Sequence, residues 1–244
     1  MGGIAAQCNP SGTEIAKGSP KTPGLAGESK TAQALTLGTL SHDDWKLYTE
    51  RLTMDHYHWL HLASVAWIVF IAYWIVSAQK LKSIKQREPR GERLMQLVFM
   101  VTAYFLMFND QFSRGWLATR FVSASPTIGE IGVAVTFAGI AFAIWARWHL
   151  GENWSATVSL KEGHELISSG PYRYIRHPIY TGMLLAFVGT ALALGEYRAL
   201  ISVCIVLFAF YSKAKKEELF LTQEFGEKFR EHSRRTGMFL PKLT

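Results

Sequence analysis

The chain is poor in the features that mark small secreted proteins and metal-binding proteins. It has two cysteines among 244 residues, and Cys8 lies in a polar stretch while Cys204 lies in an apolar block, so no disulfide is expected. No Cys and His spacing typical of a metal site is present, and we expect no metal. The start MGGIAAQC has neither a basic region nor an apolar run, and Ala6 breaks the myristoylation pattern, so neither a cleavable signal nor a myristoyl group is expected.

Acidic residues are also outnumbered, 19 against 26 basic ones, for a formal charge of +7. The basic residues flank apolar blocks instead of forming one soluble face, which argues against nucleic-acid binding and favours a membrane protein with basic cytoplasmic loops. Residues 1–45 are rich in Gly, Ser, Thr, Lys and Ala and have too little apolar surface to fold. We therefore predict a disordered tail over residues 1–45 and an integral membrane domain over residues 46–244.

Five apolar blocks carry the fold prediction. The first alone has the roughly 20 residues that a helix needs to cross a bilayer. Each of the other four is short enough to be a core helix of a soluble protein, but five such blocks in one chain favour a membrane bundle. The blocks are Trp59–Ala78, Leu94–Phe108, Ile131–Ala146, Ile179–Leu194 and Ala199–Tyr211. The prediction is an all-α membrane protein with about five transmembrane helices.

The basic residues also predict the orientation of these helices. They are dense in residues 79–93 and again after the fifth block, whereas the connection between blocks four and five holds only Glu196 and Arg198. The positive-inside rule therefore places residues 79–93, residues 147–178 and the C-terminus in the cytoplasm. Residues 156–170 predict a short cytoplasmic hairpin around Lys161–Gly163, and residues 212–232 predict a C-terminal amphipathic helix that continues block five.

The stretch GPYRYIRHPIYTG, residues 170–182, gathers cationic and aromatic groups at the start of block four. Pro178 suits the first position of a helix, so His177 is expected at or next to the N-cap, where unpaired N–H groups favour an anion. An interfacial anchor of Tyr and Arg would explain this stretch equally well when it is taken alone.

A second group of polar residues follows block five. Lys213 and Glu217 are four residues apart and share a helix face, which is either an ordinary solvated ion pair or an inward-facing carboxylate near the membrane. Together with the aromatic faces of Tyr172, Tyr174, Tyr180 and Trp154, the two groups suit a zwitterionic cofactor with a cationic centre. S-adenosylmethionine fits this set, and NADPH would make less use of the Glu217–Glu218 pair.

GHELISSGPYRYIRHPIYTGM followed by EELFLTQEFGEKFREH resembles the isoprenylcysteine carboxyl methyltransferase family, whose members are multi-pass membrane enzymes that use S-adenosylmethionine. The resemblance covers roughly residues 130–241 and rests on the pattern Arg176-His177-Pro178-x-Tyr180-x-Gly182 with the Glu pair at the family's distance. It implies a cofactor site made by His164, Glu165, Leu166, Ile167, Tyr172, His177, Pro178, Ile179, Tyr180 and Glu217. Lys213 stands where the family has a substrate-side arginine, which implies a substrate contact with charge but without a bidentate fork.

The resemblance implies methyl transfer to a lipophilic acceptor that enters from the bilayer, such as a prenylated protein, with no side chain acting as a covalent nucleophile. Three alternatives stay open. A phospholipid N-methyltransferase shares the cofactor and much of the pattern. A sterol-type reductase using NADPH has a similar RHPxYxG but a paired Asp motif in place of Glu217-Glu218. A non-catalytic membrane protein on the same fold is the third.

Overall fold

The protein was analysed as a computed structural model, in which residues 41–77, 84–87, 90–151, 159–161 and 166–242 are described. The chain divides into two compact units, Met1–Tyr48 and Thr49–Thr244, and the fold described below is that of the second unit. Its elements, including the helix that crosses the boundary, are α2 (His42–Ser77), β1 (Ile84–Arg87), α3 (Arg90–Phe108), η1 (Asp110–Phe112), η2 (Gly115–Ala118), α4 (Pro126–Leu150), β2 (Ser159–Lys161), η4 (Gly170–Arg173), α5 (Pro178–Leu194), α6 (Tyr197–Phe225) and α7 (Glu227–Arg235).

The five apolar blocks are all helical, which confirms the predicted all-α membrane fold. Four of these helices, α2, α3, α4 and α6, are long and apolar enough to cross a membrane, and α5 is a shorter apolar helix. Their outward faces carry exposed apolar side chains, such as Ile68, Val98 and Phe208. A water-facing surface would not concentrate such residues over several helices, so these faces suit lipid. The chain is therefore a multi-pass membrane protein.

Helices α4 and α5 pack closely because glycines lie at their contact. A Cβ added to Gly139 would lie 2.6 Å from the Gly182 carbonyl oxygen, and one added to Gly189 would lie 2.6 Å from that of Gly132. The contact of α5 moves from Gly189 to Gly182 as that of α4 moves from Gly132 to Gly139, so the helices run antiparallel. Small residues let membrane helices approach closely, where dispersion forces replace the missing hydrophobic effect.

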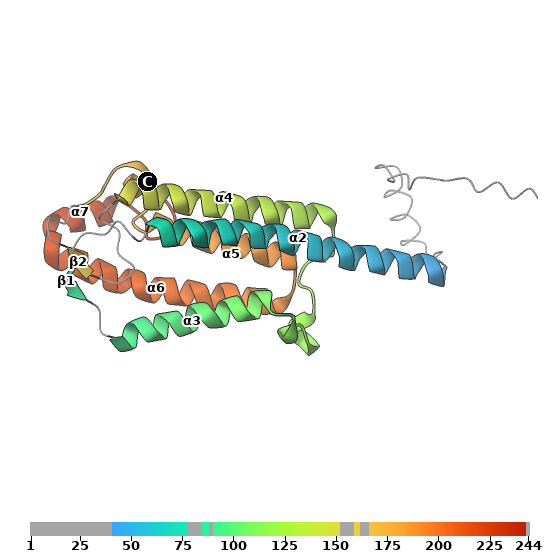
Figure 1. The fold of residues 1–244 in the computed structure, drawn as a ribbon. Coiled ribbons are helices and arrows are strands. Elements are labelled where there is room, and N and C mark those ends of the chain that lie inside the picture. The colour runs from blue at the N-terminus through green and yellow to red at the C-terminus, as the bar shows by residue number, and fades with distance from the viewer. Residues whose placement is uncertain (1–40, 78–83, 88–89, 152–158, 162–165, 243–244) are drawn as a thin grey trace, which may run out of the picture. The chain divides into compact units, whose positions relative to one another are not determined.

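Helix α2 lies beside α5, and α3 lies beside α6 (Figure 1). The Trp67 indole N–H of α2 donates a 3.0 Å hydrogen bond to the Thr190 hydroxyl of α5. The ring of Trp67 also contacts those of Tyr104 on α3 and Phe187 on α5, at centroid distances of 5.4 and 4.8 Å. These contacts join α2, α3 and α5 through one aromatic core.

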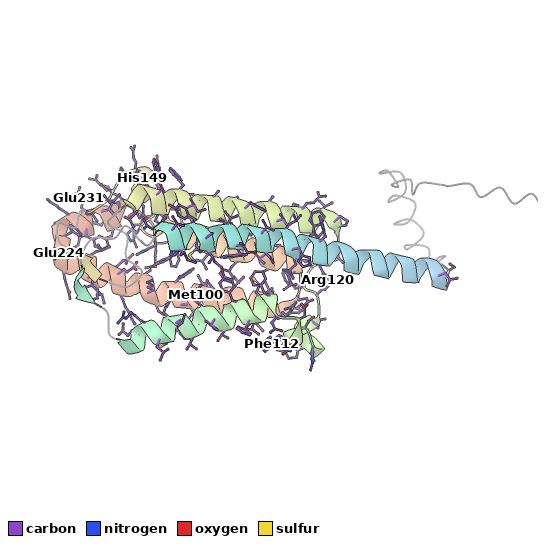
Figure 2. All side chains as sticks on the ribbon, viewed as in Figure 1. Met100, Phe112, Arg120, His149, Glu224 and Glu231 are labelled. Atoms are coloured by element: carbon purple, nitrogen blue, oxygen red, sulfur yellow. The ribbon has the colours of Figure 1, made fainter. Side chains whose placement is uncertain are left out.

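One end of the bundle is closed by a buried arginine. Arg198, 1% exposed, pairs with Glu196 at 2.5 Å and donates to the carbonyl oxygens at the C-terminal end of α3, those of Leu106, Met107 and Asn109. Phe112 and Arg120 lie at this end, whereas His149, Glu224 and Glu231 lie at the other (Figure 2). The polar cluster described below lies at the end of the bundle opposite to Arg198.

The structure bears on two local predictions. Residues Ser159–Lys161 form a strand that pairs antiparallel with β1. The turn of the predicted hairpin, residues 162–165, lies outside the described residues, so the hairpin stays a prediction. The predicted helix over 212–232 is interrupted at Gly226, whose positive φ of 55° ends α6 and lets α7 turn away.

Candidate active site

The N-terminus of α5 forms one side of the site. Pro178 occupies the first position of the helix and His177 is its N-cap residue, as the sequence predicts. The His177 side chain makes no capping hydrogen bond, so it is directed elsewhere. It is 6% exposed and therefore needs polar partners inside the protein.

Helix α6 provides two carboxylates as those partners. The His177 Nδ1 lies 3.4 Å from Glu217 Oε2, and its Nε2 lies 3.3 Å from Glu218 Oε1. A neutral imidazole can donate from one ring nitrogen only, so carboxylates facing both nitrogens favour the imidazolium form. Burial by itself lowers the pKa of His177, but the two carboxylates outweigh it and raise that pKa above its ordinary value.

A stack of rings surrounds Glu217. The Tyr180 hydroxyl donates a 2.6 Å hydrogen bond to Glu217 Oε1. The Tyr180 ring lies nearly parallel to the His177 ring, at a centroid distance of 5.5 Å, and stacks on Phe210 at 4.8 Å. Lys213 places its Nζ 5.7 Å from the centre of the Tyr180 ring. The cluster thus holds a carboxylate and an ammonium group about one helical turn apart on α6, beside the Tyr180 ring of α5.

Arg176 ties this cluster to the end of the chain. Its Nε donates a 2.6 Å hydrogen bond to Glu218 Oε1, and its Nη1 donates to the carbonyl oxygens of Ser233 and Thr236. The backbone N–H groups of Arg176 and His177 donate to the carbonyl oxygens of Gly237 and Met238, at 2.9 and 3.1 Å. The segment after α7 is therefore hydrogen-bonded to the residues that immediately precede α5.

Phe239 completes this arrangement. Its ring lies 6.3 Å from that of His177, edge to face, and its carbonyl oxygen accepts a 2.8 Å hydrogen bond from the Thr181 hydroxyl. Neither Arg176 nor Phe239 is among the predicted site residues. The RHPxYxG pattern contains Arg176, but nothing in the sequence indicates that the C-terminal segment is its partner.

Tyr172 belongs to a neighbouring buried group with Ala146 and Ile179. Its hydroxyl donates a 3.4 Å hydrogen bond to the Ala146 carbonyl oxygen, and its ring is stacked 6.4 Å from that of His149. Burial raises the pKa of Tyr172, and the charge of Glu217 adds to the rise. The hydroxyl therefore stays protonated and acts as a donor. Tyr180 packs against this group, which joins Tyr172 to the His177 cluster.

The predicted site residues fall into three sets. The structure brings together His177, Pro178, Ile179, Tyr180, Lys213 and Glu217, with Tyr172 beside them. Leu166 and Ile167 are partly buried, and Ile167 packs against the Tyr172 group. His164, Glu165 and Trp154 lie outside the described residues. Over the described ranges, no group of three or more His, Cys, Asp and Glu side chains is arranged to hold a metal ion.

Comparison with known proteins finds a matching family model, related sequences and a related solved structure. The family model described as phospholipid methyltransferase matches residues 128–228. A probable protein-S-isoprenylcysteine O-methyltransferase of Oryza sativa subsp. indica is 35% identical over 129 residues, which are 52% of this chain and 62% of that protein. The cobalt-zinc-cadmium resistance protein CzcN of Cupriavidus metallidurans is 29% identical over 150 residues, 61% of this chain and 62% of that protein.

A solved structure, titled as that of the eukaryotic intramembrane Ras methyltransferase ICMT, superimposes with a TM-score of 0.47 at 20% identity, covering 60% of this chain and 52% of that one. The chain spans about three fifths of the length of the rice and Cupriavidus relatives. The matches to proteins with the isoprenylcysteine methyltransferase name confirm the resemblance to that family that the motifs of residues 163–182 and 217–232 indicate.

Proposed function

We propose that this chain transfers a methyl group from S-adenosylmethionine to the carboxylate of a lipophilic acceptor. Relatives of the chain carry the name protein-S-isoprenylcysteine O-methyltransferase, which describes a reaction of this kind. The observation that carries the proposal is the cluster of His177, Tyr180 and Glu217 at one end of a membrane helix bundle. A carboxylate there, only 22% exposed, hydrogen-bonded to a tyrosine and facing an imidazolium next to an apolar helix bundle, is a candidate for a ligand role.

The residues present fit this cofactor. The His177 Nε2 is buried and is not aligned for a hydrogen bond with any described residue, although Glu218 lies 3.3 Å away. Such an atom can donate to an added anionic group, as can the N–H groups in the first turn of α5. Glu217 and the faces of Tyr180 and Tyr172 suit an ammonium and a sulfonium group. His164, Glu165, Leu166 and Ile167 are assigned to the same site on the strength of the family resemblance.

When bound, S-adenosylmethionine supplies a methyl group that its sulfonium already activates, so little acid–base help is needed. The chain's own residues then act by position. Tyr180 and His177 fix the orientation of Glu217 by their contacts with both of its oxygens. His177 is 6% exposed, so its contacts with the two carboxylates are shielded from water, which strengthens them.

Lys213 supports a carboxylate acceptor over an amine. Its ammonium group lies against the same ring that Glu217 contacts, and it attracts a carboxylate while it repels the cationic headgroup of an aminophospholipid. An acceptor with an apolar body would reach this position sideways from the bilayer. The basic loops of the sequence favour a site on the cytoplasmic side, where a soluble cofactor is available.

Calorimetric titration of the detergent-purified protein with S-adenosylhomocysteine, and separately with NADPH, tests the cofactor. We expect binding of the first, lost in Glu217→Ala but kept in Glu224→Ala, which removes an exposed carboxylate from the same helix (Figure 2). Binding of NADPH alone would assign the chain to the reductases. Binding of neither by folded protein would contradict an enzymatic role.

Transfer of labelled methyl to an S-farnesylated cysteine derivative tests the acceptor. A methyl ester releases its label as methanol in base, whereas an N-methyl group does not. A base-stable product formed on phosphatidylethanolamine vesicles would instead support the phospholipid N-methyltransferase alternative.

A further inference from the structure

The packing of α3 against α6 places Arg93 at the level of the site. Three contacts fix the antiparallel register: the Ser202 hydroxyl bonds to the Ala103 carbonyl oxygen, the rings of Phe99 and Phe208 lie 5.5 Å apart, and Lys216 Nζ lies 2.7 Å from Glu92 Oε2. Arg93 follows Glu92, so in this register it lies opposite the turn of α6 that holds Lys213.

Arg93 also lies on the inward stripe of α3. Arg93, Met100 and Met107 are spaced by seven residues and therefore share a helix face. Met107 is fully buried and Met100 packs against the core, so this face points into the bundle. The Arg93 Nε is itself buried, and it has no hydrogen-bond partner among the described residues.

Three described carboxylates close to Arg93 in this register are already paired. Glu92 pairs with Lys216, Glu217 with Tyr180 and His177, and Glu218 with Arg176. A buried guanidinium N–H without an acceptor is costly, because the group has lost its bonds to water. An anionic ligand that enters between α3 and α6 would remove that cost.

On the basis of the methyltransferase function proposed above, we infer that Arg93 binds the carboxylate of the acceptor together with Lys213. The guanidinium is a planar fork that pairs with both oxygens of a carboxylate, whereas the ammonium of Lys213 is a point charge. The bidentate contact that Lys213 does not make would therefore come from a different helix.

The experiment compares two probes that differ only in charge: an S-farnesylated cysteine derivative with a free carboxylate, and its methyl ester. Their dissociation constants are measured calorimetrically for the full chain and for Arg93→Gln, Arg93→Lys and Arg114→Gln. Arg114 is an exposed arginine in the loop after α3, at the other end of that helix, and serves as the matched control.

We expect Arg93→Gln to weaken binding of the carboxylate probe about 10- to 100-fold, as loss of a charged hydrogen bond does. Arg93→Lys should fall between the wild type and Arg93→Gln, and Arg114→Gln should match the wild type. Binding of the ester and of S-adenosylhomocysteine should stay within about twofold in every variant, since neither presents a carboxylate to Arg93 in this arrangement.

Equal weakening of carboxylate and ester, or no weakening of the carboxylate, would refute the role of Arg93. Unchanged binding of S-adenosylhomocysteine by Arg93→Gln shows that the variant is folded. Because the probe comparison does not depend on turnover, a wild-type protein that fails to bind S-adenosylhomocysteine or to form the ester would refute the proposed function separately.

Discussion

Replacing Arg176 by methionine should destabilise the protein and disturb the alignment of the side chains in its candidate site. The change removes the 2.6 Å bond to Glu218 and two bonds to carbonyl oxygens of the C-terminal segment, while the apolar stem of the side chain is kept. The side chains of Arg176 and Glu218 are 13% and 16% exposed, so the pair is largely buried. Removing one partner of a buried pair costs about 3–5 kcal/mol, because the other charge stays buried and loses its partner.

Partial exposure puts the expected loss at the lower end, about 3 kcal/mol, which for a chain of this size lowers the Tm by about 6–12 °C. Thermal unfolding in detergent measures it, with Arg173→Met as the control. Arg173 is three residues earlier, exposed, and 5.8 Å from the Tyr174 ring, so its loss should change the Tm little. Affinity for S-adenosylhomocysteine should fall in Arg176→Met alone, because His177 and Glu217 lose their alignment.

The double variant Arg176→Met with Glu218→Met tests the cause. Replacing both partners of a buried pair by apolar groups removes the unpaired charge, so the double variant should be more stable than Arg176→Met. An Arg176→Met protein that melts with Arg173→Met, or a double variant that melts lower than Arg176→Met, would refute the account of Arg176 as the bond between α5, α6 and the C-terminal segment.

Two further predictions concern pH and helix packing. The pKa of His177 is raised by Glu217 and Glu218, so its imidazolium stabilises the fold fully below the ordinary histidine pKa of about 6.5, and this stability is lost as the pH rises through the raised value. The Tm difference between the wild type and His177→Gln should therefore be largest near pH 6 and shrink at alkaline pH; a difference that grows with pH would contradict the imidazolium. Gly139→Ala should lower stability by about 1–3 kcal/mol in denaturant titration, since a Cβ there would lie 2.5 Å from the Ala186 backbone nitrogen. Gly91→Ala, where nothing lies within 4 Å, is the control, and equal effects of the two changes would contradict the close packing of α4 and α5.

Hydropathy was enough to predict the five apolar helices, because burial in lipid demands apolar residues along the whole span. It could not predict where α2 begins, since the residues between His42 and Trp59 are polar and leave no apolar run. Hydropathy could not predict the pairing of β1 with β2 either. Short strands carry little pattern of their own, and their partner is chosen by the arrangement of helices that brings two loops together.

The candidate site, too, could be predicted from the sequence only in part. Pro178 fixes the start of α5 by its missing N–H, so the N-cap place of His177 could be predicted from a single residue. That Glu217 faces His177 followed from the family resemblance and not from its spacing to Lys213, which fits a solvated helix equally well. The contacts of Arg176 with Ser233 and Thr236 use backbone carbonyl oxygens, which every residue type supplies. No residue pattern in the sequence therefore predicts them.

The adjacent glutamates of α6 do different work because successive residues on a helix point about 100° apart. Glu218 faces Arg176 and is tied through it to the C-terminal segment, while Glu217 faces Tyr180, on the side where Lys213 lies. His177 lies between them and contacts both. Glu218 therefore holds His177 in place on the side of the C-terminal segment. Glu217 directs its charge to the side of Tyr180 and Lys213. It follows that loss of Glu218 should act mainly through stability, and loss of Glu217 mainly through ligand binding.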